Sequence, residues 1–332
     1  SYKMRKAFIT GITGQDGAYL ARLLLEKGYK IYGLVKKNSK LDFRNNDYLG
    51  VTKEIEYVSG DMTDKASLSD PIRLVKPDEI YNLAGISTVE KPWEDLELVT
   101  KTNALGVLYV LEAIKEFSPS SRFCQASSRE MFGSSNDNGL QTEKTPFHPG
   151  STYATAKLYA HWMTFNFRKS QGLFSSSAIL FNHESPIRGS KFVTRKISSG
   201  VARIKLGLAH EIILGDLDNQ RDWGFAGDYV EAMWLMLQQE KPSDFVIATG
   251  ETHSVRDFLN VAFGHAGIID WDRHVKADPA FMRPAESVVL RGDPSLAKEM
   301  LHWKPRVKFE ELVKTMVEAD LKILSYTQAA KV

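Results

Sequence analysis

The chain has 332 residues, 43% of them hydrophobic and 25% charged, which suits a globular protein with one catalytic domain and a second, smaller lobe. The chain has 43 Lys and Arg residues and 41 Asp and Glu residues, so its net charge does not indicate binding to nucleic acid or to a membrane surface. The single cysteine, Cys124, excludes a disulfide framework and a cysteine-built metal site, and we expect a buried thiol in a cytoplasmic protein. Neither a signal peptide nor an apolar run of about 20 residues is visible.

The start of the chain predicts a dinucleotide site. A short strand at 6–10 leads into a glycine turn, and a helical pattern then runs from Ala18 to Gly28. Free N–H groups and the helix dipole hold a pyrophosphate at such a turn, although a purely structural turn is the alternative. The spacing is Gly-x-x-Gly-x-x-Gly instead of Gly-x-Gly-x-x-Gly. The predicted cofactor residues here are Gly11, Thr13, Gly14, Gln15, Asp16 and Gly17.

The next strand, at 30–35, ends in Lys36 and Lys37. An acidic residue at this point would bind the ribose 2′-hydroxyl of NAD, whereas positive charge suits the 2′-phosphate of NADP. We therefore predict NADP as the cofactor, with Lys36 and Lys37 as its ligands. The alternative is that both lysines only face solvent.

Strands at 55–58, 79–84 and 122–126 alternate with helical segments at 64–76 and 96–117. This alternation predicts an α/β protein, a Rossmann-type doubly wound parallel sheet with a smaller mixed α/β substrate-binding lobe. We expect the sheet domain to take 1–178 plus about 215–247, and the lobe about 179–214 plus 248–332. Ligands bind at the carboxyl ends of such strands, so five more residues should line the cofactor: Asp61, Met62, Leu83, Ala84 and Ser87.

Tyr153 and Lys157 follow a strand that ends in serines and lie in a helical pattern. At positions i and i+4 they share a helix face, and a nearby ammonium lowers the pKa of a phenol toward the value that a general base needs. The same spacing occurs at two other places in the chain, so its position after the serines is what favours a catalytic role.

Longer segments resemble one known family. The chain is similar, from about residue 6 to 324, to the GDP-mannose 4,6-dehydratases, which are extended short-chain dehydrogenase/reductases (the NAD-dependent epimerase/dehydratase family) that modify nucleotide sugars. The matching segments are the glycine turn, Asn82-Leu83-Ala84, Leu180-Phe181-Asn182-His183-Glu184-Ser185-Pro186, Phe192-Val193-Thr194-Arg195-Lys196, Arg221-Asp222-Trp223-Gly224, Tyr229-Val230-Glu231-Ala232-Met233-Trp234-Leu235-Met236-Leu237 and Trp303-Lys304-Pro305-Arg306.

The resemblance implies a hydro-lyase of deoxysugar biosynthesis: C4 of the sugar is oxidised, water leaves across C5 and C6, and the hydride returns to C6 from bound NADP. Tyr153 would take the O4 proton, with Lys157 holding the nicotinamide ribose and lowering the tyrosine pKa. Ser128 stands where the family has threonine and would donate to O4. Glu130 would take the C5 proton and return it to the departing C6 hydroxyl; without the family it would be a surface carboxylate.

The resemblance also implies the remaining binding residues and the assembly. His183 and Arg188 match positions near the NADP. A homodimer through the helices at 96–117 and 153–167, or a homotetramer, is the expected assembly. The residues expected to bind the GDP-sugar are Ser87, Ser128, Glu130, Asn182, Val193, Lys196, Leu214, Gly215, Arg221, Arg283 and Glu286.

Departures from the family lie beside the sugar. The family's Pro-Arg-Ser-Pro-Tyr is Pro149-Gly150-Ser151-Thr152-Tyr153 here, its Ala-Gln-Ser is Gly85-Ile86-Ser87, and its Ser-Thr-Ser-Glu is Ser127-Ser128-Arg129-Glu130. A GDP-heptose is therefore an alternative to a GDP-hexose. A GDP-4-keto-sugar reductase or epimerase, and a nucleotide-sugar-binding or NADP-sensing protein without turnover, are further alternatives. Glu130 distinguishes a dehydratase from a reductase, because a 4-keto reductase needs no base at C5.

Overall fold

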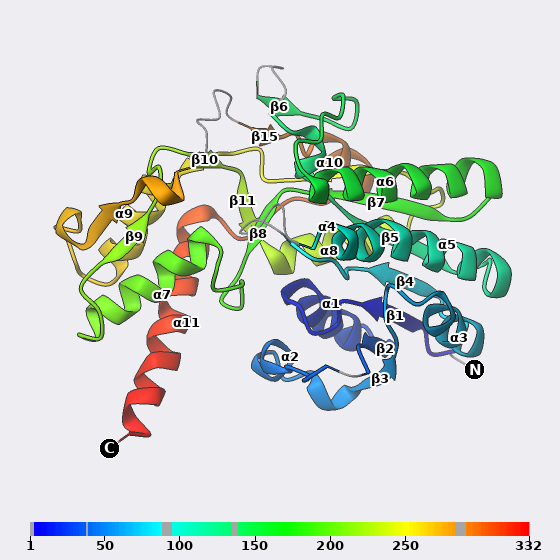
Figure 1. The fold of residues 1–332 in the computed structure, drawn as a ribbon, viewed down its shortest axis with the longest axis horizontal. Helices are drawn as coiled ribbons and strands as arrows, with labels where there is room; N and C mark the ends of the chain where they lie inside the picture. Colours follow the sequence, from blue (N-terminus) through cyan, green and yellow to red (C-terminus); the bar gives the residue numbers. More distant parts are fainter. Residues whose placement is uncertain (1–2, 38, 88–94, 135–138, 283–289, 332) are drawn as a thin grey trace.

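A seven-stranded parallel sheet forms the centre of the molecule (Figure 1). The computed structural model describes residues 3–37, 39–87, 95–134, 139–282 and 290–331. The strand order is β12-β7-β5-β4-β1-β2-β3, so the order reverses beside β1, as in a doubly wound sheet. The strands are β1 (Lys6–Thr10), β2 (Lys30–Val35), β3 (Ile55–Ser59), β4 (Glu79–Asn82), β5 (Arg122–Ser128), β7 (Ser175–Leu180) and β12 (Phe245–Ile247).

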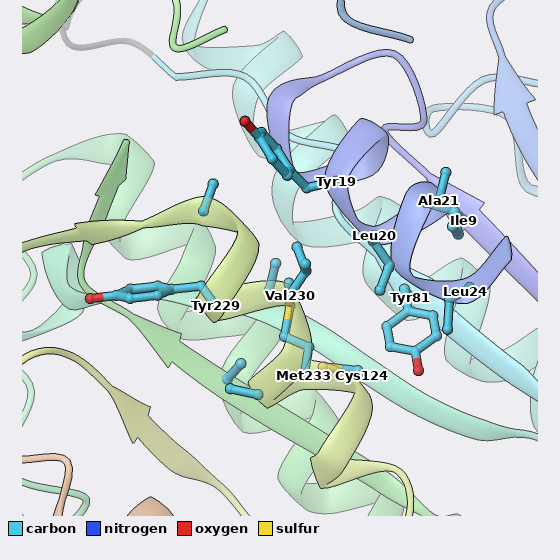
Figure 2. Close-up of a cluster of buried hydrophobic side chains, with 14 of the residues drawn as sticks. Ile9, Tyr19, Leu20, Ala21, Leu24, Tyr81, Cys124, Tyr229, Val230 and Met233 are labelled. Carbon is cyan, nitrogen blue, oxygen red and sulfur yellow. The ribbon is translucent and has the colours of Figure 1, made fainter. Parts of the chain in front are cut away.

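Helices cover both faces of this sheet, and the strand residues alternate between them. Ala7 and Ile9 of β1 join a core cluster under α1 and α8, whereas Phe8 joins a second cluster under α3, α5 and α6. Figure 2 shows the first cluster, in which Leu20 and Leu24 of α1 lie near Tyr81 of the sheet. The covering helices are α1 (Gln15–Glu26), α3 (Lys65–Val75), α5 (Gly106–Phe117), α6 (Thr152–Gln171), α8 (Ala226–Met236) and α10 (Ser295–Leu301).

The predicted helix at 96–117 is one helical stretch with a local distortion. It contains α4 (Leu96–Thr100), a π-helical turn at Lys101–Leu105, and α5. Single π turns inside helices are rare and are found mostly at functional sites. The distortion therefore makes Lys101–Leu105 a candidate part of a functional site.

The smaller lobe lies at the opposite end of the molecule from the N-terminus in Figure 1 and has its own core. Phe258 and Phe263 of α9 are fully buried there with Val313 and Met316 of α11. The elements in and beside this core are β8 (Asn182–Glu184), α7 (Val193–Lys205), β9 (Ile212–Leu214), β10 (Gln220–Arg221), β11 (Trp223–Phe225), β13 (His253–Ser254), α9 (Val255–His265), β14 (Val275–Ala277) and α11 (Phe309–Ala329).

Short elements complete the chain. β6 pairs in parallel with β15 above the sheet, and Ala297 and Leu301 of α10 belong to the core cluster of α1 and α8. None of the helices in the described part of the chain is long and apolar enough to span a membrane. These elements are α2 (Arg44–Tyr48), β6 (Leu140–Gln141), β15 (Arg291–Gly292), and 3-10 turns at Thr52–Glu54, Arg129–Phe132, Asp272–His274 and Pro279–Phe281.

Helix α11 is fixed to α7 by a buried ion pair. The Arg195 Nη2 lies 2.8 Å from Asp320 Oδ1, and the Asp320 side chain is 3% exposed. Ser198 also donates to Asp320, over 2.6 Å. A buried carboxylate that loses its cation remains desolvated, so this contact is costly to break.

We predict that Arg195→Ala lowers the free energy of unfolding by about 3 kcal/mol, because it leaves the Asp320 carboxylate buried without a counter-charge. Urea unfolding measures the difference. The matched control is Arg306→Ala, since Arg306 pairs with Glu231 but its side chain is 72% exposed; an exposed pair contributes less than about 1 kcal/mol. Equal losses in the two variants would contradict the prediction.

Candidate active site

The glycine turn between β1 and α1 has no room for side chains on its inner face. Gly11 has φ of +71°, and a Cβ on it would lie 2.7 Å from the Ala84 backbone nitrogen. A Cβ on Gly17 would lie 2.2 Å from the Gly11 carbonyl oxygen. Gly14 is the residue before the first turn of α1, and no side chain accepts a hydrogen bond from the first N–H groups of this helix. Close backbone packing with an uncapped helix start is what a dinucleotide pyrophosphate requires, so these residues fit a dinucleotide cofactor.

Thr13, Gln15 and Asp16 extend the turn toward other elements. The Thr13 carbonyl accepts from the Asn45 side chain over 3.0 Å, and Gln15 donates to the His183 carbonyl over 3.1 Å. The Ser185 hydroxyl donates to Gln15 over 2.6 Å. The cofactor turn is therefore tied to the β8 segment of the smaller lobe.

The ends of β2 and β3 bring two of the predicted cofactor residues together. The Lys36 ammonium lies 3.7 Å from Asp61, and both side chains are accessible to solvent. Lys37 is also exposed, and Met62 is buried where α5 begins, since a Cβ on Gly106 would lie 2.9 Å from the Met62 carbonyl oxygen. The edge of the sheet beside the glycine turn therefore carries exposed positive charge.

The turn after β4 lies directly over the glycine turn. The backbone N–H groups of Leu83 and Ala84 both donate to the Thr10 hydroxyl, each over 3.1 Å. Ser87, the last described residue of this turn, is exposed. These predicted cofactor residues lie at the carboxyl edge of the sheet, as expected from parallel strands.

Ser128, Glu130 and Tyr153 converge at the end of β5 and the start of α6. The Ser128 hydroxyl accepts the Glu130 backbone N–H over 3.1 Å, and hydrogen bonding from Ser128 acts to lower the pKa of the Tyr153 phenol. The negative charge of Glu130 acts on the same phenol. Ser151 caps α6 by accepting the Ala154 N–H, so the helix start that carries Tyr153 is fixed.

The electrostatics of Tyr153 and Lys157 differ from the expectation. Burial raises the pKa of Tyr153 to about 12, and the Ser128 hydrogen bond offsets only part of the rise. Burial lowers the pKa of Lys157 to about 8. The Lys157 ammonium donates to the Ala126 carbonyl over 2.9 Å and lies 5.8 Å from the centre of the Tyr153 ring. The prediction that Lys157 lowers the tyrosine pKa is therefore wrong for the protein alone, because desolvation dominates both groups.

Asn103 is a site residue that sequence reasoning did not identify. It lies in the π turn and is 1% exposed, and its side chain accepts the Ile86 N–H over 2.8 Å and donates to the Ile86 carbonyl over 2.9 Å. A Cβ on Gly85 would lie 3.4 Å from both the Asn103 Oδ1 and the Lys157 Nζ. Asn103 thus holds the turn after β4 close to Lys157. No local sequence pattern predicts a π turn, so nothing in the sequence indicated this residue.

His183 forms an ion pair with Asp16 across the two lobes. Its Nε2 lies 2.7 Å from the Asp16 carboxylate and its Nδ1 lies 2.8 Å from the Phe181 carbonyl oxygen, so both ring nitrogens face acceptors. Burial alone would lower the pKa of His183, but the charge of Asp16 and its hydrogen bond outweigh burial and raise it. Burial would likewise raise the pKa of Asp16, but His183 lowers it.

Arg188 lies near the same group. Its guanidinium is 2.7 Å from Glu184 and 3.6 Å from the centre of the Phe192 ring. Its charge lowers the pKa of both Asp16 and Tyr153, which places it beside the catalytic edge of the sheet. His183 therefore contacts the glycine turn through Asp16, and the charge of Arg188 acts on both Asp16 and Tyr153.

The residues predicted to bind the GDP-sugar gather in the smaller lobe. Asn182 in β8 pairs with Trp223 in β11, two residues after Arg221, and Val193 and Lys196 lie in the first turn of α7. The Lys196 ammonium lies 4.4 Å from the centre of the Phe281 ring. Leu214 ends β9, and Gly215 is packed against the Phe281 carbonyl. Arg283 and Glu286 lie outside the described residues.

A doubly wound parallel sheet, a glycine turn and a Ser-Tyr-Lys group at its carboxyl edge define an extended short-chain dehydrogenase/reductase. A family model described as GDP-mannose 4,6 dehydratase matches residues 8–316. The chain belongs to the GDP-mannose 4,6-dehydratase family, a family of hydro-lyases. The predicted fold class and the predicted GDP-sugar 4,6-dehydratase activity are confirmed.

Relatives of high coverage support the assignment. GDP-mannose 4,6 dehydratase 1 of Arabidopsis thaliana is 48% identical, over 97% of this chain and 91% of its own length. The human GDP-mannose 4,6 dehydratase is 46% identical, over 96% of this chain and 92% of its own length. The Yersinia enterocolitica GDP-mannose 4,6-dehydratase is 43% identical, with 96% and 94% covered.

Solved structures share the fold at lower identity. The dTDP-glucose 4,6-dehydratase of Bacillus anthracis in complex with NAD has a TM-score of 0.83 at 20% identity, with 97% of this chain and 98% of that chain covered. RMD from Pseudomonas aeruginosa complexed with NADPH has a TM-score of 0.80 at 23% identity, with 96% and 98% covered.

We predict that the Asp16–His183 pair makes stability depend on pH. The raised pKa of His183 adds stability that is complete below about pH 6.5, its unfolded value, and is lost as pH rises through the folded value. The lowered pKa of Asp16 adds stability above about pH 4 that is lost in stronger acid. Asp16→Asn should therefore lower the free energy of unfolding by about 2 kcal/mol near pH 6, as expected for a part-buried ion pair, and by less near pH 9.

Urea unfolding of wild type and Asp16→Asn at several pH values measures this difference. His265→Asn is the control, because its partner Glu318 is 65% exposed. An Asp16→Asn loss that stays constant from pH 6 to pH 9 would show that His183 carries no proton in the folded protein.

Proposed function

We propose that this enzyme dehydrates a GDP-hexose or GDP-heptose, with bound NADP as the cofactor. The observation that carries the proposal is the convergence of Ser128, Glu130 and Tyr153 at the carboxyl edge of the sheet. NADP supplies a reversible hydride acceptor when it is bound. The glycine turn fits its pyrophosphate, Lys36 and Lys37 fit its 2′-phosphate, and the turn after β4 together with His183 and Arg188 lines the space between.

The side chains divide the chemistry among themselves. Tyr153 takes the proton from O4 while the Ser128 hydroxyl donates a hydrogen bond to that oxygen. A carbonyl at C4 acidifies the proton on C5, which moves to the Glu130 carboxylate. Glu130 then gives that proton to the C6 hydroxyl, which leaves as water. One carboxyl group thus serves as base and then as acid. The proton that Tyr153 took from O4 goes to C5 when the hydride returns to C6, so the enzyme consumes no external proton donor.

Lys196 of the smaller lobe and Arg221 of the segment that returns to the sheet domain supply charge for the GDP moiety. Lys196 and Arg221 carry positive charge on α7 and β10, and guanidinium and ammonium groups bind a diphosphate through charge-assisted hydrogen bonds. Their positions, with Asn182 on the neighbouring β8, support a GDP site in the lobe and the sugar at its boundary with the sheet. The division into a sheet domain (1–178 plus about 215–247) and a lobe (about 179–214 plus 248–332) belongs to this proposal.

A homodimer through α5 and α6, or a homotetramer, is the proposed assembly. Two aromatic residues of α6 support it, because Tyr159 is 37% and Trp162 is 46% exposed on the surface of one chain. Aromatic side chains are enriched at interfaces between subunits. The single, fully buried Cys124 supports a cytoplasmic location.

We predict that the purified enzyme converts a GDP-sugar to a product lighter by one water molecule, without added NADPH. Glu130→Gln should reduce kcat by about 10²–10⁴-fold, the usual contribution of a general acid–base, and should leave a 4-keto sugar with its C6 hydroxyl intact. Mass spectrometry of the sugar follows both. Glu299→Gln, an exposed residue of α10, is the control. Stoichiometric consumption of NADPH by the wild type would instead support a 4-keto reductase.

We predict that replacing Lys36 and Lys37 by glutamine weakens NADP binding by about tenfold or more and leaves NAD binding unchanged. The reason is the loss of charge-assisted hydrogen bonds to the 2′-phosphate, each of about 1.5–3 kcal/mol. Calorimetric titration with NADP and with NAD gives the ratio of the two affinities in each variant. Lys40→Gln, in the same exposed segment, is the control. An unchanged ratio of the two affinities would mean that the lysines only face solvent.

A further inference from the structure

Arg129 is a charged residue where charge is unexpected. It follows β5 directly and stands between Ser128 and Glu130, where the family pattern has a serine. Yet it is 6% exposed, and arginine is rarely buried without partners. The Arg129 Nε is buried and has no hydrogen-bond partner among the described residues. Such a group raises the question of what the guanidinium does at this position.

The charge of Arg129 is matched by the adjacent carboxylate. Its Nη1 lies 3.2 Å from the Glu130 Oε1. The two side chains differ in environment, because the Arg129 side chain is 7% exposed and the Glu130 side chain is 47% exposed. The Arg129 guanidinium is therefore desolvated. The Glu130 carboxylate is partly accessible to solvent, and one of its oxygens contacts Arg129.

The local backbone explains why two consecutive residues meet. Ser128 is still extended, and the chain then turns into a 3-10 segment in which the Ser128 hydroxyl accepts the Glu130 N–H. This cap fixes the Glu130 backbone, and the turn lets the Arg129 and Glu130 side chains point to the same side. Ser128 thus holds the backbone of Glu130, and Arg129 holds one oxygen of its carboxylate.

We propose that Arg129 is a positioning residue for the elimination step, an inference that rests on the proposed function. It holds Glu130 as a carboxylate aimed at the C5 proton of the sugar. When Glu130 has taken that proton, the buried guanidinium loses its counter-charge, which favours return of the proton to the departing C6 hydroxyl. The proton that leaves C5 is the proton that leaves with the C6 oxygen as water, so the step balances without another reactant.

The step that depends on Arg129 is distinct from the oxidation at C4. In the proposed mechanism the C4 oxidation uses Tyr153 and Ser128, and the hydrogen bond and ion pair of the Arg129 side chain in the described part of the chain go to Glu130 instead. Loss of Arg129 should therefore slow proton removal at C5 and leave hydride removal at C4 unchanged. A merely structural role would slow both steps together.

The experiment compares Arg129→Gln with wild type on a GDP-sugar carrying deuterium at C4 or at C5. We expect kcat to fall about 10–100-fold, as when a catalytic group is misplaced by about 1 Å, with little change in KM. We also expect a larger isotope effect for the C5 label and a smaller one for the C4 label. Arg129→Lys, which keeps the charge, should restore part of kcat. Arg129→Ser, the family's residue, should behave like Arg129→Gln.

Arg168→Gln is the matched control, because Arg168 pairs with Asp244 over 2.8 Å, is 15% exposed and lies on α6 far from Tyr153. It should lower stability without changing the isotope effects. If Arg129→Gln is recovered unfolded, the isotope effects of Arg129→Ser provide the same test. Isotope effects identical to wild type in the folded variant overturn the positioning role alone. A wild type that dehydrates no GDP-sugar overturns the proposed function and this inference with it.

Discussion

A buried chain of polar side chains fixes the three central strands on which the site depends. Thr10 of β1 donates to Asn82 of β4 over 2.6 Å, and Asn82 donates to Gln125 of β5 over 2.8 Å. All three are fully buried and directly opposite in the strand register. A slip of one residue would leave each of them unsatisfied in the core. The same strands end in the glycine turn, the turn after β4 and Ser128, so this register sets the relative positions of the cofactor and catalytic groups.

Burial explains why the catalytic groups carry unfavourable pKa values in the protein alone. The pKa of Tyr153 is raised to about 12 and that of Lys157 is lowered to about 8, each mainly by desolvation. Lys157 is buried and Tyr153 is partly exposed, so a bound ligand would exclude the remaining water and strengthen the electrostatic interactions of both groups. In the proposed mechanism, the phenolate of Tyr153 is therefore favoured only when ligands bring charge and hydrogen bonds to it.

Much of the fold and part of the site could be predicted from sequence, because both rest on local patterns. The strands, the glycine turn and the helix that carries Tyr153 and Lys157 follow from periodicity and glycine spacing, and they occur where predicted. The role of Asn103 could not be read in this way, since a π turn has no local signature and its contact with Ile86 joins distant segments. The pKa of Tyr153 was predicted with the wrong sign, because helix spacing gives the distance to Lys157 but says nothing about desolvation.

The contacts between lobes follow from the demands of a reaction with no net redox change. A hydride that leaves C4 and returns to C6 of one sugar requires that cofactor and sugar keep their places through oxidation, elimination and reduction. In this chain Gln15 and Asp16 of the cofactor turn contact Ser185 and His183 of the segment that follows β7. The strand next to that segment leads back to Arg221, on the proposed diphosphate side. The proposed cofactor and substrate sites therefore share one set of part-buried contacts, and separating the two segments breaks the charged hydrogen bond between Asp16 and His183.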